Sequence, residues 1–168
     1  MEYARIDSPV GPLLLAGDAD GLAVLSFAGA RFAGDGRPKA PVPVAPDWEP
    51  DRGALREARA ELAAYFAGAL RRFSIPVRPA GTGFQRRVWE ELQRIPYGET
   101  INYRDLAVRI GNPQAVRAVG LANGANPIAI VIPCHRVIGS NGALVGFGGG
   151  LPIKQALLDL ERGQGRLI

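Results

Sequence analysis

The sequence predicts an α+β fold, with a small amino-terminal domain of antiparallel sheet plus helix and a mostly helical carboxy-terminal domain that contains a helix-turn-helix. Three observations predict it. Short apolar runs separated by turn residues fill the first thirty positions, apolar residues at helical spacing dominate the chain after residue 82, and residues 78–81 (Arg-Pro-Ala-Gly) are typical of a linker. We therefore expect two domains, residues 1–80 and 81–168.

Three apolar runs of strand length open the amino-terminal domain: residues 3–6, 13–16 and 22–27. Turn-forming residues separate them, which predicts a three-stranded antiparallel meander. Residues 34–50 contain five prolines and little periodicity, which indicates a surface loop. A helix is expected next, and residues 73–77 then suggest one more edge segment. The apolar residues of the helix recur at helical spacing: Leu55, Ala58, Leu62, Tyr65, Phe66 and Ala69.

The carboxy-terminal domain is expected to begin with a capped helix. Thr82 and Gln85 have the spacing of a capping box, in which a hydroxyl and an amide side chain satisfy free backbone N–H groups at a helix start. Pro96 and Gly98 end the helix. Its apolar stripe consists of Phe84, Val88, Leu92 and Ile95.

Two closely joined helices follow and predict the helix-turn-helix. Asn102 is the expected N-cap of the first, which extends to Ile110. Asn112 and Pro113 predict that the second helix begins at once, with a cap followed by proline at the first helical position, and that it reaches residues 123–124. The side of this second helix that we expect to face the core consists of Val116, Val119 and Ala122.

The second helix has a composition that suits a nucleic-acid groove. Its residues from Gln114 on, such as Ala118, are mostly small and would let the helix lie close to a groove, and Arg117 is its one long cation. Residues 1–83 carry ten basic and ten acidic side chains, whereas residues 84–168 carry ten and six, so the net charge of +4 lies in the second half. Both observations favour DNA as partner. Helix-turn-helix units also occur in proteins that bind no DNA, and so small an excess is ordinary for a surface.

Cys134 is the only cysteine of the chain, and it directly precedes the only histidine, His135. Residues 128–132 have the composition of a buried strand, and Pro133 cannot continue a central ladder, so we expect the chain to leave the sheet at Cys134. A lone thiol cannot form an internal disulfide or a multi-cysteine metal cluster. It is either a small buried apolar residue or a reactive group.

A reactive thiol needs a base or a positive neighbour, and His135 and Arg136 are the candidates. Adjacent residues on an extended chain point to opposite sides, which favours a bridging water between Cys134 and His135. The imidazole would need an acceptor to orient it. Glu161 stands near the end of a final helix that Pro152 opens, where a negative charge is unfavourable, and this indicates a partner such as His135.

Six glycines mark the segment before this last helix: Gly139, Gly142, Gly146, Gly148, Gly149 and Gly150. The segment lacks the lysine and the spacing of a phosphate-binding P-loop. We interpret it as the wall of a pocket, with a flexible turn as the alternative.

Composition argues against several other classes. No stretch approaches the roughly 20 apolar residues that cross a bilayer, and the first residues lack the layout of a signal peptide. An unpaired thiol suits a reducing compartment, so we expect the protein to be cytoplasmic. We expect no cofactor, no metal and a monomer.

Three segments together resemble the O6-alkylguanine-DNA alkyltransferases, also called methylated-DNA-protein-cysteine methyltransferases: residues 133–138 (Pro-Cys-His-Arg-Val-Ile), 124–127 (Gly-Ala-Asn-Pro) and 112–120. The resemblance is specific from about Thr82 to Glu161 and looser before it. It implies a DNA repair protein that transfers a methyl or other alkyl group from O6 of guanine in double-stranded DNA, with O4 of thymine as a second candidate site. The transfer would be irreversible, so each molecule would act once.

The resemblance also implies the catalytic roles. Cys134 would attack the alkyl carbon, and His135 would draw off the thiol proton through a water while Glu161 orients the imidazole. Tyr103 would offer its hydroxyl to guanine N3, and Asn126 would tie the recognition helix to the reactive segment.

On the DNA side, the resemblance implies that Arg117 fills the gap left by a flipped nucleotide, with Gln114, Ala118 and Arg136 as further DNA contacts. The pocket for the flipped base would include Val137, Phe147 and Gly148. Family members often have a tyrosine and then a serine or small residue where this chain has Phe147 and Gly148, so we expect an altered rate or alkyl range. The chain contains nothing like the four-cysteine zinc domain of some relatives.

Three alternatives stay open from the residues. A DNA-damage sensor related to the alkyltransferases would flip lesions without repairing them, but such proteins lack the acceptor cysteine that is present here. A helix-turn-helix regulator would follow duplex sequence rather than an alkylated base. A cysteine hydrolase would turn over an acyl substrate many times.

Overall fold

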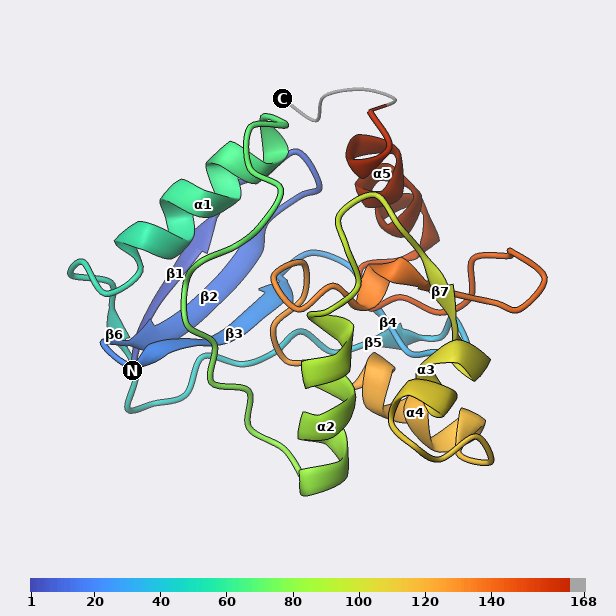
Figure 1. Cartoon of the computed structure of the whole chain (residues 1–168). Coiled ribbons are helices and arrows are strands. Elements are labelled where there is room, and N and C mark those ends of the chain that lie inside the picture. Colours follow the sequence, from blue (N-terminus) through green and yellow to red (C-terminus); the bar gives the residue numbers. More distant parts are fainter. Residues whose placement is uncertain (164–168) are drawn as a thin grey trace.

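The computed structural model describes residues 1–163 and has the predicted α+β architecture. Its amino-terminal part is a sheet with the strand order β3 (Gly21–Phe27), β2 (Leu13–Asp18), β1 (Glu2–Ile6) and β6 (Glu49–Pro50). One helix, α1 (Arg56–Phe66), lies against a face of this sheet (Figure 1). The predicted meander is confirmed: β1 (Glu2–Ile6) pairs antiparallel with β2 (Leu13–Asp18), and β2 pairs antiparallel with β3 (Gly21–Phe27).

The proline-rich segment is largely the exposed loop that was expected, but it contains two short strands, one of which corrects the expected three-stranded sheet. β6 (Glu49–Pro50) adds a fourth strand parallel to β1, because Glu49 N donates to Met1 O at 3.0 Å and Asp51 N to Tyr3 O at 2.9 Å. β4 (Arg31–Phe32) and β5 (Pro38–Lys39) form a small hairpin of their own. Prolines are compatible with such short edge strands.

The outer edge of β3 joins the two parts of the molecule. Leu22 N donates to Pro76 O at 2.9 Å, and Arg78 N donates back to Leu22 O, so the expected edge segment pairs with β3 through a single bridge at Val77. Further along the same edge, Leu25 N donates to Pro127 O at 2.9 Å and Ala129 N donates to Leu25 O at 3.0 Å. The segment that leads to Cys134 is therefore anchored on the amino-terminal sheet.

Residues 128–132 are buried as expected, but they do not form a strand. They make a compact turn in which Ile132 N donates to Ile128 O at 3.0 Å, and Ile130 has a positive φ of 71°. Only Ile128 pairs with the sheet. A short apolar run predicts burial reliably but cannot distinguish a buried strand from a buried turn.

The first carboxy-terminal helices have the predicted caps. α2 (Gly83–Leu92) begins with the complete capping box of Thr82 and Gln85. β7 (Ile101–Asn102) leads into α3 (Tyr103–Arg109), where Asn102 forms a second capping box with Asp105. Gly111 ends α3 with a φ of +81°.

The second helix of the helix-turn-helix, α4 (Val116–Gly124), begins later than expected. Residues 112–115 form a turn closed by Ala115 N and Asn112 O at 3.0 Å, and no side chain caps the helix. Val119 and Ala122 face the core as predicted, whereas Val116 is 38% exposed, which corrects its assignment. Trp89 of α2 holds α4 in place by donating from Nε1 to Ala122 O at 2.8 Å.

The remaining elements bring the reactive segment beside α3. A single 3-10 turn, η1 (Cys134–Arg136), runs into β8 (Val137–Ile138), which pairs in parallel with β7. α5 (Leu151–Glu161) follows the glycine-rich segment and has Pro152 in its first turn. Within residues 1–163, none of the helices has the length and apolarity needed to cross a membrane.

Candidate active site

Cys134 begins η1, and backbone and amide hydrogen bonds fix its position. Its own N–H donates to Ile132 O at 2.8 Å. The Asn126 side chain binds the preceding turn at both ends, because Nδ2 donates to Ile132 O at 2.8 Å and Oδ1 accepts from Ile128 N at 3.0 Å. Asn123 of α4 adds a longer contact from Nδ2 to Cys134 O at 3.5 Å. The thiol is thus held on a rigid turn, with only 7% of the residue exposed.

His135 is fully buried and pairs with Glu161, at the end of α5, over 2.6 Å between Nε2 and Oε2. An ionised carboxylate only accepts hydrogen bonds, so Nε2 carries the proton and Nδ1 presents a lone pair. Nδ1 has no hydrogen-bond partner within the described part of the chain. Burial lowers the pKa of His135 more than Glu161 raises it, so the imidazole is a neutral base at neutral pH.

Glu161 is held by Arg136 as well as by His135. Arg136 Nε donates to Oε1 at 2.7 Å, Nη2 to Oε2 at 3.1 Å, and Nη1 to Ile95 O at 2.7 Å. Burial by itself raises the pKa of Glu161, but the hydrogen bonds and charges of His135 and Arg136 lower it further, so the carboxylate stays ionised.

Arg136 is therefore not a DNA contact, which corrects the sequence interpretation. It is 6% exposed, and its nitrogen atoms are committed to Glu161 and Ile95. A buried arginine in a bidentate pair orients a carboxylate.

Lys154 is a functional candidate that the sequence analysis missed. It is completely buried, and its Nζ donates to Val137 O at 2.7 Å and to Val145 O at 2.9 Å. It thus ties the strand after Cys134 to the glycine-rich segment. The signal was available, because Lys154, Leu157 and Glu161 lie at i, i+3 and i+7 on the inward face of one helix.

The charge of Lys154 acts on the thiol. Burial raises the pKa of Cys134 and outweighs the opposing effects of a hydrogen bond from Asn126 and the positive charge of Lys154, which lower it. Burial also lowers the pKa of Lys154, to about 8, although the nearby Cys134 opposes this. At neutral pH the ammonium form still predominates, so it favours the thiolate.

We expect Lys154→Met to make Cys134 less reactive. Without the buried cation the pKa of the thiol rises, and the thiolate fraction at pH 7 falls. Alkylation by iodoacetamide should be several-fold slower at pH 7, and its pH profile should move to higher pH. Lys39→Met is the matched control, because Lys39 is exposed in β5. A Lys154→Met profile that coincides with the wild type would contradict the electrostatic role.

Contacts from the amino-terminal part of the molecule hold the glycine-rich segment in place. Phe147 packs edge-on against Phe27 of β3 with 5.4 Å between ring centroids, and Phe32 N donates to Gly148 O at 2.9 Å. Val137, the residue after η1, is fully buried. Tyr103 reaches the same segment with its hydroxyl, 3.4 Å from Val145 O. Burial raises the pKa of Tyr103 to about 12, with a further contribution from Cys134, so its hydroxyl keeps its proton.

The expected DNA-facing residues lie at the surface. Gln114 in the turn before α4, and Arg117 and Ala118 on α4, are exposed. Leu121, one turn after Arg117, is 78% exposed and extends the same side of the helix.

Comparison with known proteins identifies relatives over the whole length. Residues 1–79 match the family profile described as 6-O-methylguanine DNA methyltransferase, ribonuclease-like domain, and residues 83–163 match the one described as 6-O-methylguanine DNA methyltransferase, DNA binding domain. A methylated-DNA--protein-cysteine methyltransferase of Methanosarcina acetivorans is 52% identical over 96% of this chain and 98% of its own. The Mycobacterium tuberculosis protein of the same name is 49% identical over 96% and 93%.

Solved structures of the same family superpose on this chain. The crystal structure of Mycobacterium tuberculosis OGT in complex with DNA superposes with a TM-score of 0.87 at 48% identity, covering 99% of this chain and 96% of that one. The O6-methylguanine-DNA methyltransferase of Pyrococcus kodakaraensis has a TM-score of 0.61 at 21% identity over 95% and 98%, which shows a shared fold.

Proposed function

This chain belongs to the 6-O-methylguanine DNA methyltransferase family, and from that premise we propose that Cys134 is its alkyl acceptor. The protein repairs DNA by transferring an alkyl group from O6 of guanine in duplex DNA to a cysteine, and Cys134 is the only cysteine in the chain. The observation that carries the assignment is a buried thiol next to a buried His135–Glu161 pair whose Nδ1 is free to accept a proton.

The reaction balances with these groups. The thiol proton of Cys134 passes through a water to His135 Nδ1, and Glu161 stabilises the imidazolium that forms. The thiolate sulfur then attacks the alkyl carbon, the new C–S bond replaces the carbon–O6 bond, and the electron pair stays on the guanine. Tyr103 donates its proton to N3 as the base leaves, and the His135 imidazolium returns the thiol proton through the water to Tyr103. The base therefore leaves in neutral form, and both side chains recover their starting protonation states.

The pocket for the flipped base lies between Val137 and the segment of Phe147 and Gly148. The carbonyl of Val137 accepts a hydrogen bond from Lys154 and has a second lone pair for the base. Gly148 offers only its N–H where relatives often add a hydroxyl. We therefore expect repair with an altered rate or alkyl range, and we treat O4-alkylthymine as a second possible substrate.

The helix-turn-helix delivers the lesion. O6 of a stacked guanine faces the major groove, so a buried thiolate reaches its alkyl group in line only after the nucleotide has flipped out, at a cost of a few kcal/mol. Gln114 and Ala118 lie on the groove side, and Arg117 fills the vacated position. We place the protein in the cytoplasm, where an unpaired thiol stays reduced, and expect it to act as a monomer.

The test is the intact mass of the protein after incubation with a duplex that contains O6-methylguanine. We expect a gain of about 14 Da, one methylene, located on the peptide that contains Cys134. An undamaged duplex is the control and should leave the mass unchanged. An unchanged mass with the damaged duplex under native conditions would refute the proposed function.

Arg117→Ala should separate base flipping from chemistry. Without the long cation the flipped state of a duplex loses stability, so we expect repair of duplex DNA to slow by about 100-fold. Reaction with free O6-benzylguanine, which needs no flipping, should change by less than about twofold. Arg109→Ala, on the neighbouring helix α3, controls for loss of a positive charge. Equal losses on the two substrates would remove this role from Arg117.

A further inference from the structure

A tyrosine from the amino-terminal part of the molecule reaches the catalytic carboxylate. Tyr65 lies in the last turn of α1, and its hydroxyl donates to Glu161 Oε2 at 2.7 Å, across 96 positions of the chain. Its side chain is completely buried. The sequence pattern placed Tyr65 only on the apolar side of α1, since helical spacing does not reveal a hydrogen bond to a distant helix.

The hydrogen bond falls on the oxygen that also holds the imidazole. Glu161 Oε2 accepts from Tyr65 at 2.7 Å, from His135 Nε2 at 2.6 Å and from Arg136 Nη2 at 3.1 Å. The three donors share the negative charge of one oxygen, so each makes it a weaker acceptor for the others. The Tyr65 hydroxyl therefore affects how strongly Glu161 Oε2 accepts the hydrogen bond from His135 Nε2.

Tyr65 can act only as a donor. Burial, together with the charge of Glu161, raises its pKa well above 10, so it keeps its proton throughout the working range of pH. Within residues 1–163, the hydroxyl has Glu161 as its one hydrogen-bond partner. It touches no reacting atom, which excludes a role as acid or base.

We propose that Tyr65 is a positioning residue for alkyl transfer, through which the amino-terminal domain sets the hydrogen bond between Glu161 and His135. The inference rests on the proposed function. It gives the sheet-and-helix part a direct influence on the chemistry, beyond its anchoring of residues 127–129.

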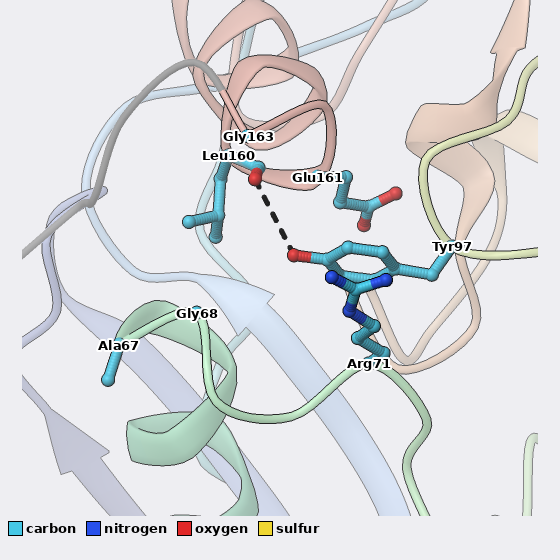
Figure 2. Close-up of a pocket in the computed structure, with 7 residues that line it drawn as sticks. All are labelled: Ala67, Gly68, Arg71, Tyr97, Leu160, Glu161 and Gly163. Atoms are coloured by element: carbon cyan, nitrogen blue, oxygen red, sulfur yellow. Dashed lines mark hydrogen bonds between the residues drawn. The ribbon is translucent and has the colours of Figure 1, made fainter.

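The other charged and titratable groups around the His135–Glu161 pair stay the same when the Tyr65 hydroxyl is removed. Arg136 binds both oxygens of Glu161, and Lys154 acts on His135 from α5. Cys134 adjoins His135 in η1. Tyr97 packs edge-on against Tyr65 with 6.3 Å between ring centroids and, together with Glu161, lines a pocket of about 280 Å³, where the Arg71 guanidinium lies over its ring (Figure 2).

Tyr97 provides a matched control. Its hydroxyl is close to Glu161 but hydrogen-bonds to Leu160 O at 3.5 Å, as Figure 2 shows, and not to the carboxylate. Tyr65→Phe and Tyr97→Phe each remove one hydroxyl and keep the ring. The aromatic packing of Tyr65 with Phe66 and Phe73, at centroid distances of 5.4 and 5.3 Å, is preserved in Tyr65→Phe.

The experiment measures single-turnover methyl transfer from damaged duplex against pH, together with the ring resonances of His135 by NMR. The chain has one histidine, so these resonances need no assignment. In Tyr65→Phe the carboxylate has one donor fewer and holds the imidazolium more firmly, so the pKa of His135 should rise. The acid limb of the rate profile should move to higher pH, so that the rate at a fixed pH on that limb falls several-fold while the rate at pH 7 changes little. Tyr97→Phe should behave as the wild type.

A Tyr65→Phe protein with wild-type His135 resonances and an unshifted rate profile would overturn the inference. A loss of thermal stability without any movement of the His135 pKa would do so as well, because it would indicate a purely structural role. Failure of the proposed function is a separate result, since the wild type would then gain no methyl group while the NMR comparison would still report whether Tyr65 acts on His135.

Discussion

Cys134→Ala is expected to abolish alkyl transfer completely while the protein still folds and binds DNA. The chain contains no second thiol, and the other groups at the site are not nucleophiles of comparable strength at neutral pH. Alanine fits the site, because Cys134 is a small buried residue, and the loss of one sulfur atom should cost only about 1 kcal/mol of stability. The DNA-facing residues of α4 are not altered by this change.

The measurement combines intact mass with DNA binding. With O6-methylguanine duplex the variant should gain no mass, yet it should bind the duplex with an affinity close to that of the wild type. A gain of about 14 Da in the variant would show that another residue accepts the methyl group. Loss of binding together with loss of transfer would indicate that the substitution disturbs the fold, which thermal unfolding of the free protein would reveal.

The wild-type protein should act once per molecule. A methyl thioether on Cys134 has no ready leaving route, and the chain supplies no second cysteine to remove the group. Repair should therefore stop at one equivalent of lesion, however long the incubation.

Local sequence signals predicted the local structure well. The meander follows from apolar runs separated by turn residues, and the capping boxes at Thr82 and Asn102 follow from side chains that satisfy backbone groups three residues away. The capping interactions are made within the segment itself, so the sequence specifies them without knowledge of the rest of the fold.

The wrong predictions of secondary structure concern segments whose conformation depends on contacts with distant parts of the chain. Residues 128–132 form a turn because Leu25 on the edge of β3 pairs with only one of them, at Ile128. The second helix begins at Val116 rather than at Pro113, because the chain first makes a turn that packs α4 against α2. The sequence pattern alone does not predict either contact.

At the site, too, local motifs indicated some of the residues, whereas most contacts between distant segments could not be predicted from them. Motif similarity predicted Cys134, His135 and Glu161, and the structure brings His135 and Glu161 together. Motif similarity also predicted that Arg136 contacts DNA, which is wrong because its guanidinium is buried against Glu161. Helical spacing does not reveal the hydrogen bond of Tyr65 to Glu161, whereas the spacing of Lys154 with Leu157 and Glu161 already indicated an inward-facing lysine.

Among the substitutions proposed for this site, Glu161→Gln should cause the largest loss of stability, together with a large loss of activity. In the wild type this carboxylate accepts hydrogen bonds from Tyr65, His135 and Arg136. A neutral amide leaves the buried Arg136 without its countercharge, and removing one partner of a buried pair typically costs about 3–5 kcal/mol. The amide also stabilises the His135 imidazolium poorly, so we expect methyl transfer to slow by about 100-fold or more.

The stability difference should depend on pH in a defined direction. The pKa of Glu161 is lower in the folded protein than in the unfolded chain, where a glutamate titrates near about 4.3. Its contribution is therefore fully present above about pH 5 and is lost as pH falls toward the lower folded pKa. Wild type and Glu161→Gln should differ most near pH 7, and the gap should narrow below pH 5.

Denaturant unfolding of both proteins at pH 7 and at pH 3 measures this gap. Glu90→Gln on the exposed side of α2 is the matched control and should change stability by less than about 0.5 kcal/mol at either pH. A gap that stays constant between pH 7 and pH 3 would mean that Glu161 is not the ionised centre of the cluster. In that case its hydrogen bonds, rather than its charge, would hold His135 and Arg136 in place.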